Sequence, residues 1–338
     1  MVEMVSKKPA WLAKLKAYEK PDLRRSLWQL ANTLIPYFLL WGIMVVTVQR
    51  GLSYWITLLL AVPAALLLVR IFIFFHDCTH GSFFEQRWAN ALVGYLTGIL
   101  TFTPYDEWKY THGVHHSAVG NLDKRGVGDV WTATVEEYQA MPPLKRLGYR
   151  LYRHPLVMFG LGPAFVFLLA NRLPRKGASK AATRSVHFTN LAIVAILVIA
   201  HFTIGLRTYI MVQLPIILLA ALMGVWLFYV QHQFEGVYWA RSAEWDQVRA
   251  SLEGSSYYKL PKVLQWFSGN IGLHHIHHLR PRIPNYNLQR CYDEVPEVQG
   301  VRPLTLRESL RCLRMNLYDE ANRRLISFAD LRRQQAKA

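Results

Sequence analysis

Four stretches of the chain are apolar over a length that can cross a membrane. They cover residues 27–48, 52–75, 188–206 and 209–230. A helix of ~20 residues, rising 1.5 Å per residue, crosses the ~30 Å hydrocarbon core of a bilayer. Tight turns at about 49–53 and 207–208 join the stretches in pairs. The pattern therefore predicts two transmembrane hairpins.

Two shorter apolar stretches, 88–104 and 156–170, are less suited to crossing. Each contains Gly and Pro, and each is at or below the length that a span requires. We expect both to lie in the membrane interface, or to enter the bilayer and return on the same side.

Histidines gather beside the ends of these apolar stretches. One pair is spaced i, i+4, two triplets are spaced i, i+3, i+4, and a further histidine follows the fourth stretch. On a helix, such spacings place side chains on one face. One ion seldom takes more than four protein nitrogens, so this set predicts two metal ions. The candidate ligands are His76, His80, His112, His115, His116, His232, His274, His277 and His278.

A lone histidine is most often a surface residue or a hydrogen-bonded core residue. The chain has 13 histidines in 338 residues, so the clustering carries the signal and the count does not. We assign His154, His187 and His201 to this ordinary class. His275 could pair with His278, three residues later. His274, however, completes with His277 and His278 the same i, i+3, i+4 spacing that the other triplet has. We therefore expect His275 beside the ligands or at the surface.

The ligands of one site must lie on one side of the membrane, and this requirement fixes the topology. If both short stretches crossed the bilayer, His112 would lie on the other side of the membrane from His76. Four spans place both termini and every histidine cluster on one face. Of the 39 Lys and Arg residues, only Arg50 and Arg207 fall on the other side, and all 22 Asp and Glu residues are on the histidine side. The positive-inside rule makes that face cytoplasmic, in a multi-pass protein of the cell membrane.

One metal site shared by all soluble segments predicts one domain, residues 1–338. It comprises an N-terminal segment (1–25), two hairpins (27–75 and 188–230) and two cap segments (76–187 and 231–338). Residues 9–23 alternate basic and apolar side chains, which predicts an amphipathic helix on the membrane surface, with a solvated loop as the alternative.

The net charge of +17 can be explained without nucleic-acid binding. The basic residues border apolar spans, where topology and anionic lipid headgroups account for them, so we expect no nucleic-acid partner. An acidic electron donor would also be attracted to this face. Cys78, Cys291 and Cys312 have no C-x-x-C spacing, so we expect neither a disulfide nor an iron–sulfur cluster.

The number of histidines exceeds what zinc hydrolysis needs, which is three ligands, an open position and a carboxylate base. Two irons can reduce O₂ and oxidise an unactivated C–H bond, which no side chain can do. The matching substrate is an acyl chain that enters a dry cavity from the bilayer. Three alternatives remain. An acyl or alkane hydroxylase would use a similar site, a metal transporter would carry ligands within its spans, and a structural membrane protein would need no metal.

The motifs H-D-C-T-H at His76, H-G-V-H-H at His112 and H-H-I-H-H at His274 resemble the three histidine boxes of the membrane fatty acid desaturase family. Flanking stretches extend the resemblance over about residues 26–310, most closely to the bacillar delta-5 acyl-lipid desaturases. They are R-I-F-I-F-F-H-D-C at Arg70, N-L-D-K-R-G-V-G-D-V-W at Asn121, G-V-W-L-F-Y-V-Q-H at Gly224, E-G-S-S-Y-Y-K-L-P-K at Glu253, G-N-I-G-L-H-H-I-H-H at Gly269 and P-N-Y at Pro284.

The resemblance implies an all-α, mushroom-shaped membrane fold with four transmembrane helices and a cytoplasmic helical cap. It implies two non-haem irons held by the eight box histidines, with His232 as a ninth ligand. The implied reaction places a cis double bond in phospholipid acyl chains, with O₂ as oxidant and ferredoxin or flavodoxin as electron donor. Delta-5 is the implied position. Delta-9 and delta-12 stay open, because no local motif encodes the depth of a cavity.

One departure concerns the metal surroundings. Animal acyl-CoA desaturases have an asparagine four residues before the extra histidine, where this chain has Phe228. We expect Asn270, four residues before His274, to take the place of that asparagine near the metal site. The alternative is that Asn270 caps a helix or lies in a turn. Carboxylates that could accept from ligand imidazoles are Asp77, Asp106, Asp123, Asp129 and Glu235, and we expect most of them to be ordinary surface or capping residues. Trp108, Trp131 and Trp266 would line the membrane edge, the core or the cavity.

Overall fold

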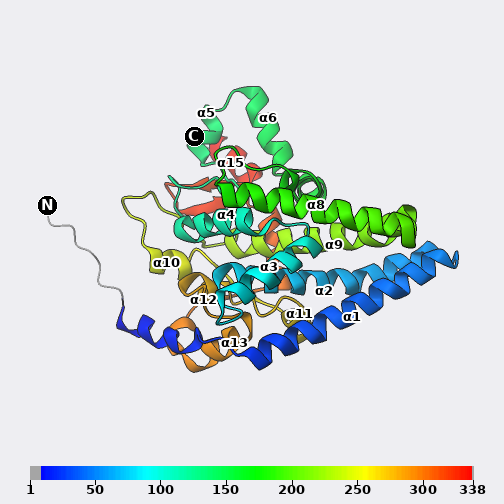
Figure 1. Cartoon of the computed structure of the whole chain (residues 1–338). Coiled ribbons are helices and arrows are strands. Elements are labelled where there is room, and N and C mark those ends of the chain that lie inside the picture. Colours follow the sequence, from blue (N-terminus) through cyan, green and yellow to red (C-terminus); the bar gives the residue numbers. More distant parts are fainter. Residues whose placement is uncertain (1–8, 337–338) are drawn as a thin grey trace.

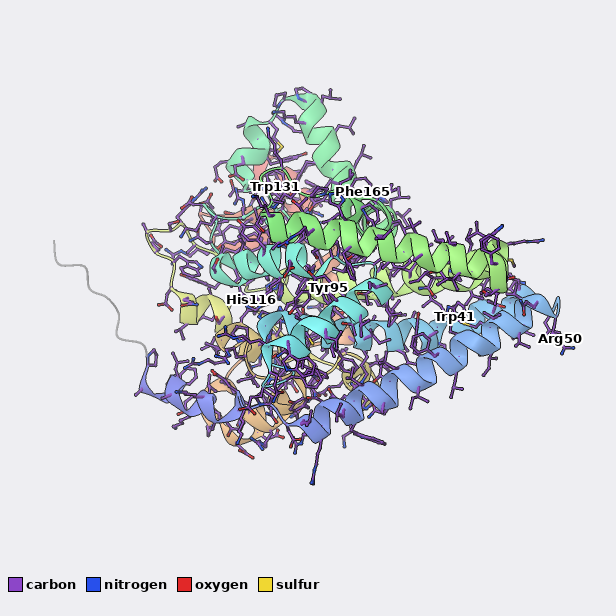
Figure 2. All side chains as sticks on the ribbon, viewed as in Figure 1. Trp41, Arg50, Tyr95, His116, Trp131 and Phe165 are labelled. Atoms are coloured by element: carbon purple, nitrogen blue, oxygen red, sulfur yellow. The ribbon has the colours of Figure 1, made fainter. Side chains whose placement is uncertain are left out.

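The structure, a computed structural model, describes residues 9–336. Four of its helices are long and apolar enough to cross a membrane, and they lie along one another with their connecting turns at the same end (Figure 1). These helices are α1 (Leu23–Gln49), α2 (Tyr54–His80), α8 (Lys180–Thr203) and α9 (Leu206–His232). Figure 2 places Arg50 at the tip of this bundle and His116 far from it. The predicted all-α fold with four apolar helices is confirmed.

The helix ends differ from the predicted spans in two places. Helices α2 and α9 continue without a break past residues 75 and 230, so His80 and His232 form their last turns. The second hairpin turns at Ile204 and Gly205, and the predicted turn at 207–208 is wrong because those residues already belong to α9. Gly205 has φ +86°, a conformation that favours glycine, and this makes it the turning point.

Helix α2 is the centre of the bundle and packs against both α1 and α9. Its small residues Ala61, Ala64 and Ala65 are fully buried, which allows the helices to approach closely. By contrast, α1 and α8 expose large apolar side chains, including Leu39 at 63% and Phe202 at 80%. Such surfaces are unusual on a protein surrounded by water and are suited to contact with lipid.

The two short apolar stretches do not form ordinary spans. The first is α3 (Arg87–Leu100), whose 14 residues are too few to cross and which packs against α2. The second is broken into η2 (Val157–Leu161), α7 (Gly162–Leu168) and η3 (Ala170–Arg172). Together with α6 (Pro143–Tyr152) it forms a pair bent by 62°. This bend fits a segment that enters the bilayer and returns.

The other elements form a cap at the end of the bundle opposite the connecting turns (Figure 1). Its helices are η1 (Ala10–Tyr18), α4 (Tyr105–Ala118), α5 (Val135–Ala140), α10 (Gln247–Leu252), α11 (Lys262–Phe267), α12 (His274–Leu279), α13 (Asn285–Glu294), η4 (Pro296–Val298), α14 (Leu306–Ser309), η5 (Leu310–Arg314) and α15 (Phe328–Gln335). Four short strands were not predicted. β1 (Tyr257–Lys259) pairs in parallel with β2 (Pro303–Thr305), and β3 (Leu317–Asp319) pairs antiparallel with β4 (Arg324–Ile326). Three residues are too few to show an alternating pattern.

The N-terminal segment corrects one prediction. Element η1 is a 3₁₀ helix, and its apolar residues Leu12, Leu15 and Tyr18 are buried in a cluster with Leu288 and Cys291 of α13. Protein therefore covers the apolar side that we expected to face the membrane surface. Residues 1–8 of the predicted segment 1–25 lie outside the described residues.

Candidate metal centre

The ends of α2 and α9 meet α4 and α12, and together they collect all nine candidate histidines into two groups. The first histidine group consists of His76, His80, His112, His116 and His277. The second histidine group consists of His115, His232, His274 and His278. Within each group, one potential ligand atom per residue lies within 4.8 Å of all the others.

Each triplet is divided between the two groups, which the sequence did not predict. On α4, His112 and His116 belong to the first histidine group and His115 to the second. On α12 the i, i+4 pair His274 and His278 belongs to the second group. Neighbouring residues on a helix point about 100° apart, so His115 and His116 cannot aim at one centre. The same two helices therefore supply both groups.

The nitrogens in each group converge on one another. In the second histidine group, His232 Nε2 lies 3.1 Å from His115 Nε2 and 3.0 Å from His274 Nε2. A neutral imidazole carries one proton, so Nε2 atoms that face each other cannot all share hydrogen bonds. In the first group, the buried Nε2 atoms of His76 and His80 have no hydrogen-bond partner among the described residues. Converging lone pairs of this kind fit a cation that prefers nitrogen ligands.

Burial favours the form of histidine that binds metals. It lowers the pKa of His112, His115 and His116 well below the ordinary value, and neighbouring imidazoles lower the pKa of each further. The pKa values of His274 and His278 are lowered for the same two reasons. These rings are therefore neutral at pH 7, with a lone pair available for coordination.

A network of hydrogen bonds fixes Asp77 beside the first histidine group. Its Oδ1 lies 3.2 Å from His76 Nδ1, and its Oδ2 accepts from Asn285 N at 2.7 Å and Asn285 Nδ2 at 2.9 Å. Gln29 of α1 donates to Asn285 Oδ1 at 2.9 Å. Asp77 was among the predicted carboxylates. Asn285 and Gln29 were missed, although the P-N-Y motif at Pro284 marks the place.

The other predicted carboxylates have different partners. Asp106 accepts from Tyr95, Asp123 accepts from Arg241 and Ser242, and Asp129 accepts from Gly126. The described hydrogen bonds join none of these three, nor Glu235, to a box histidine, which agrees with the expectation that most of the five carboxylates are ordinary surface or capping residues. His232 Nδ1 instead lies 3.4 Å from the carbonyl oxygen of Gly254.

The structure also decides between the alternatives for two neighbouring residues. Asn270 does not share a helix face with His274, because α12 begins at His274; it lies in a turn with φ +57° and donates to the carbonyl oxygen of Asn285. His275 is fully buried, which excludes the surface alternative and leaves the one beside the ligands, and its Nε2 lies 3.0 Å from the carbonyl oxygen of Val298. His154, His187 and His201 are exposed and lie outside both groups.

An apolar cavity of about 230 Å³ reaches both histidine groups. His76 and His112 of the first group and His274 of the second line it. Most of its other lining residues are apolar, and they come largely from α2, α7 and α9: Leu68, Val69, Phe72, Ile73, Val166, Phe167, Ile217, Ala220, Ala221, Gly224, Val225, Leu227 and Phe228. Trp108 lies in its wall and stacks on His112 with 4.0 Å between ring centroids. Of the two other predicted tryptophans, Trp131 packs in a core cluster and Trp266 is partly exposed.

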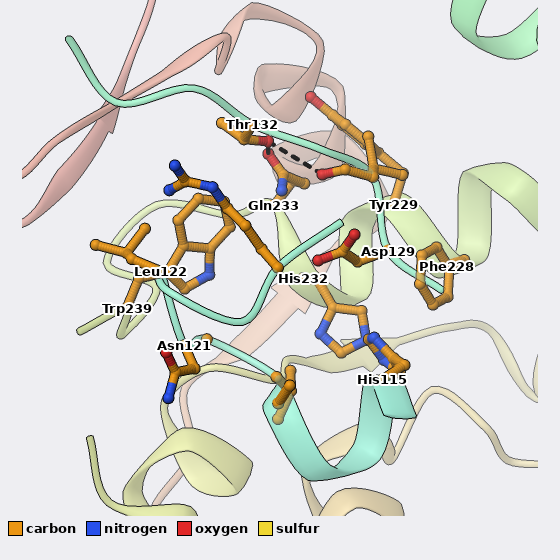
Figure 3. A pocket seen from close by; sticks show the side chains of 15 residues that line it. His115, Asn121, Leu122, Asp129, Thr132, Phe228, Tyr229, His232, Gln233 and Trp239 are labelled. Carbon is orange, nitrogen blue, oxygen red and sulfur yellow. Dashed lines mark hydrogen bonds between the residues drawn. The ribbon is translucent and has the colours of Figure 1, made fainter. Parts of the chain in front are cut away.

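A second, smaller cavity of about 40 Å³ lies beside the second histidine group. Figure 3 shows His115 and His232 together in its wall, with Thr132, Tyr229 and Gln233 above them in this view. Thr132 Oγ1 donates to Gln233 Oε1 at 3.2 Å. This cavity has both polar and apolar lining residues and has room for about one water molecule.

The comparisons with known proteins agree with this architecture. The family model for fatty acid desaturases matches residues 49–309. The chain is 47% identical over 312 residues to the fatty acid desaturase of Bacillus subtilis (strain 168), covering 92% of this chain and 88% of that protein. It is 28% identical over 233 residues to the sn-1 oleoyl-lipid 12-desaturase of a Synechocystis species, covering 68% and 65%. It is 27% identical over 244 residues to the sn-1 acyl-lipid omega-3 desaturase (ferredoxin) of a Nostoc species, covering 68% and 64%.

An all-α protein with four membrane-length helices and a histidine-rich metal site at the ends opposite their connecting turns is what a membrane desaturase requires. The chain belongs to the fatty acid desaturase family. It is an oxidoreductase of lipid metabolism, and the resemblance carried by the three histidine boxes is confirmed.

Proposed function

We propose that this protein is an O₂-dependent acyl-lipid desaturase that places a cis double bond in the fatty acyl chains of membrane phospholipids. The observation that carries the proposal is the apolar cavity that ends at His76, His112 and His274. It brings a hydrocarbon chain to both histidine groups at once and keeps water away from the reacting carbons.

The nine histidines fit two ions, and we propose that these are non-haem irons. His76, His80, His112, His116 and His277 would hold one, and His115, His232, His274 and His278 the other. Bound iron would supply the redox chemistry that side chains lack. The chain's own residues position the acyl chain, exclude water through Phe72 and Phe228, and orient the His76 ring through Asp77.

The overall reaction balances as follows. The acyl chain loses one hydrogen from each of two adjacent methylenes, and O₂ takes these two hydrogens, two protons and two external electrons to give two waters. We propose ferredoxin or flavodoxin as the electron source, a choice supported by relatives whose names include ferredoxin. The arginine and lysine distribution supports a cytoplasmic metal site in the cell membrane.

Expression in a host that lacks desaturases tests this proposal. Lipids from cells with the wild-type chain should contain a new double bond, located by mass spectrometry. The resemblance implies delta-5, and the same spectra distinguish delta-9 and delta-12. His112→Ala should abolish the product, whereas His187→Ala, at an exposed position outside both groups, should keep it. A product with an inserted hydroxyl would instead identify a hydroxylase, and wholly saturated lipids would refute the proposal.

A further inference from the structure

A large basic cleft opens in the cap, away from the apolar cavity. It has a volume of about 1040 Å³ and lies between the end of α6, η5, β4 and α15. We call it the basic cleft and define it by its seven arginines, Arg150, Arg153, Arg311, Arg314, Arg324, Arg332 and Arg333. Only two carboxylates, Glu235 and Asp330, line it with them. The cleft therefore carries a strong positive charge.

Most of this charge is not neutralised by the protein itself. Arg311, Arg314, Arg324 and Arg332 are exposed, and among the described residues none of them forms an ion pair with a carboxylate. Elsewhere in the cap, Arg241 pairs with both Asp123 and Glu320. A concave surface lined by uncompensated charge of one sign attracts a partner of the opposite sign from a distance.

The bottom of the cleft is connected to the second histidine group through Gln233. Arg153 is buried, and its Nη2 donates to Gln233 Oε1 at 3.2 Å and to Tyr229 Oη at 3.0 Å. Gln233 directly follows His232 in the chain, and His232 belongs to the second histidine group. One hydrogen bond and one peptide unit therefore connect the bottom of the cleft to a candidate ligand.

The surroundings favour a protein partner over a lipid surface. Within the described residues, η5, β4 and α15 expose no large apolar side chain beyond Leu310, and the apolar side chains that α6 exposes, such as Leu144 and Leu147, are not among the residues that line the cleft. A segment that inserts into a bilayer needs such side chains. Arginine is also a preferred residue at protein interfaces, because its planar group binds carboxylates with two parallel hydrogen bonds.

We propose that the basic cleft is the docking site for the electron donor, an acidic one-electron carrier protein. This inference rests on the proposed function, because only a reaction that consumes two external electrons requires such a partner. The acidic face of the carrier pairs with Arg311, Arg314, Arg324 and Arg332. Its redox group then lies over Arg153, and each electron passes through Gln233 and His232 to the second histidine group.

Steady-state kinetics on the full-length protein in detergent tests the docking site. The donor is a ferredoxin kept reduced by NADPH and its reductase, and reduced methyl viologen serves as a small reductant that needs no docking. Arg324→Glu with Arg332→Glu reverses two exposed charges in the cleft. The matched control is Lys16→Glu with Arg282→Glu, two exposed cations without ion pairs in the described residues, near η1 and α12. Figure 1 shows η1 at the opposite edge of the cap from α6 and α15.

The cleft variant should raise the KM for ferredoxin by about tenfold or more and weaken the dependence of kcat/KM on salt. Its rate with methyl viologen should equal that of the wild type, which shows that the protein is folded. An unchanged KM for ferredoxin, or an equal rise in the control variant, would overturn the proposal. The proposal would also be overturned if the cleft variant lost affinity for vesicles of anionic phospholipid but kept its KM for ferredoxin. If the wild type forms no double bond with either reductant, the proposed function fails, and the docking proposal fails with it.

Discussion

At the scale of single residues, the division of each histidine triplet is the main determinant of the site. His115 and His116 are neighbours in the chain but serve different groups, as do His277 and His278. The rings of His116 and His278 stack across the boundary with 4.2 Å between centroids. The two groups are therefore adjacent, and both take histidines from α4 and α12, so a shift of either helix would disturb both.

Asp77 is the residue that most directly tests the surroundings of the metal. Asp77→Asn replaces an acceptor with an amide whose NH₂ would face the donors of Asn285 or the His76 ring. Partners of ligand histidines typically contribute about 10- to 100-fold to metal affinity. We therefore expect the variant to lose iron at a chelator concentration about 10- to 100-fold lower than the wild type requires. Asp123→Asn, which alters an exposed carboxylate bound to Arg241, is the control and should retain iron like the wild type.

The residues of the site differ in how far the sequence could predict them. Eight of the nine histidines could be found because i, i+3 and i+4 spacings are local and need no knowledge of the fold. His232 has no such partner and was included because it follows the fourth apolar stretch and matches the extra histidine of the family that the sequence resembles. Asn285 could not, because its carboxylate partner Asp77 is 208 residues away in the chain. The failed choice of Asn270 has the same origin: its spacing from His274 fits one helix face, but a turn separates them.

At the scale of elements, α9 forms one wall of the apolar cavity with small residues. Ala220, Ala221 and Gly224 all line this cavity, and a Cβ added at Gly224 would meet no other atom within 4 Å. Small side chains on α9 thus leave the space that an acyl chain would occupy.

Gly224→Leu tests whether the substrate enters this space. The new side chain would fill part of the 230 Å³ cavity. A mismatch of a single methylene in an apolar pocket is worth about 1–3 kcal/mol, so the rate with the native acyl chain should fall by about tenfold or more. Gly42→Leu on α1 also enters open space but lies outside the cavity, and its rate should stay near that of the wild type. Equal rates in both variants, measured by product formation, would mean that the chain binds elsewhere.

Elements were predicted well where length and periodicity are strong. The four apolar stretches gave four helices, and the histidine spacing matched helices α2, α4 and α12. The second turn was misplaced by a few residues because Arg207, although charged, lies in the first turn of α9, which begins at Leu206 directly after Gly205. The pairing of β1 with β2 joins residues more than 40 positions apart, such as Tyr257 and Pro303. Register across such a distance is not encoded in either short segment.

At the scale of the whole molecule, the cap, with η1 near its N-terminal end and α15 near its C-terminal end, lies at one end of the four membrane-length helices. The connecting turns near Gly51 and Gly205 are the only described backbone at the other end of the four long helices. This arrangement puts the basic cleft and both histidine groups at the same end of the four long helices.

Reporter fusions test this orientation. A fluorescent protein fused to the C-terminus should fluoresce, because it folds in the cytoplasm, whereas alkaline phosphatase inserted after Gly51 should be active, because it would lie outside. Inactive phosphatase at Gly51 together with active phosphatase at the C-terminus would reverse the proposed topology.

The metal content of the purified full-length protein tests the central claim most directly. Two histidine groups of five and four nitrogen donors predict two irons per chain, measured by inductively coupled plasma mass spectrometry on protein from iron-supplied cells. One metal ion per chain, or zinc in place of iron in active protein, would contradict the account.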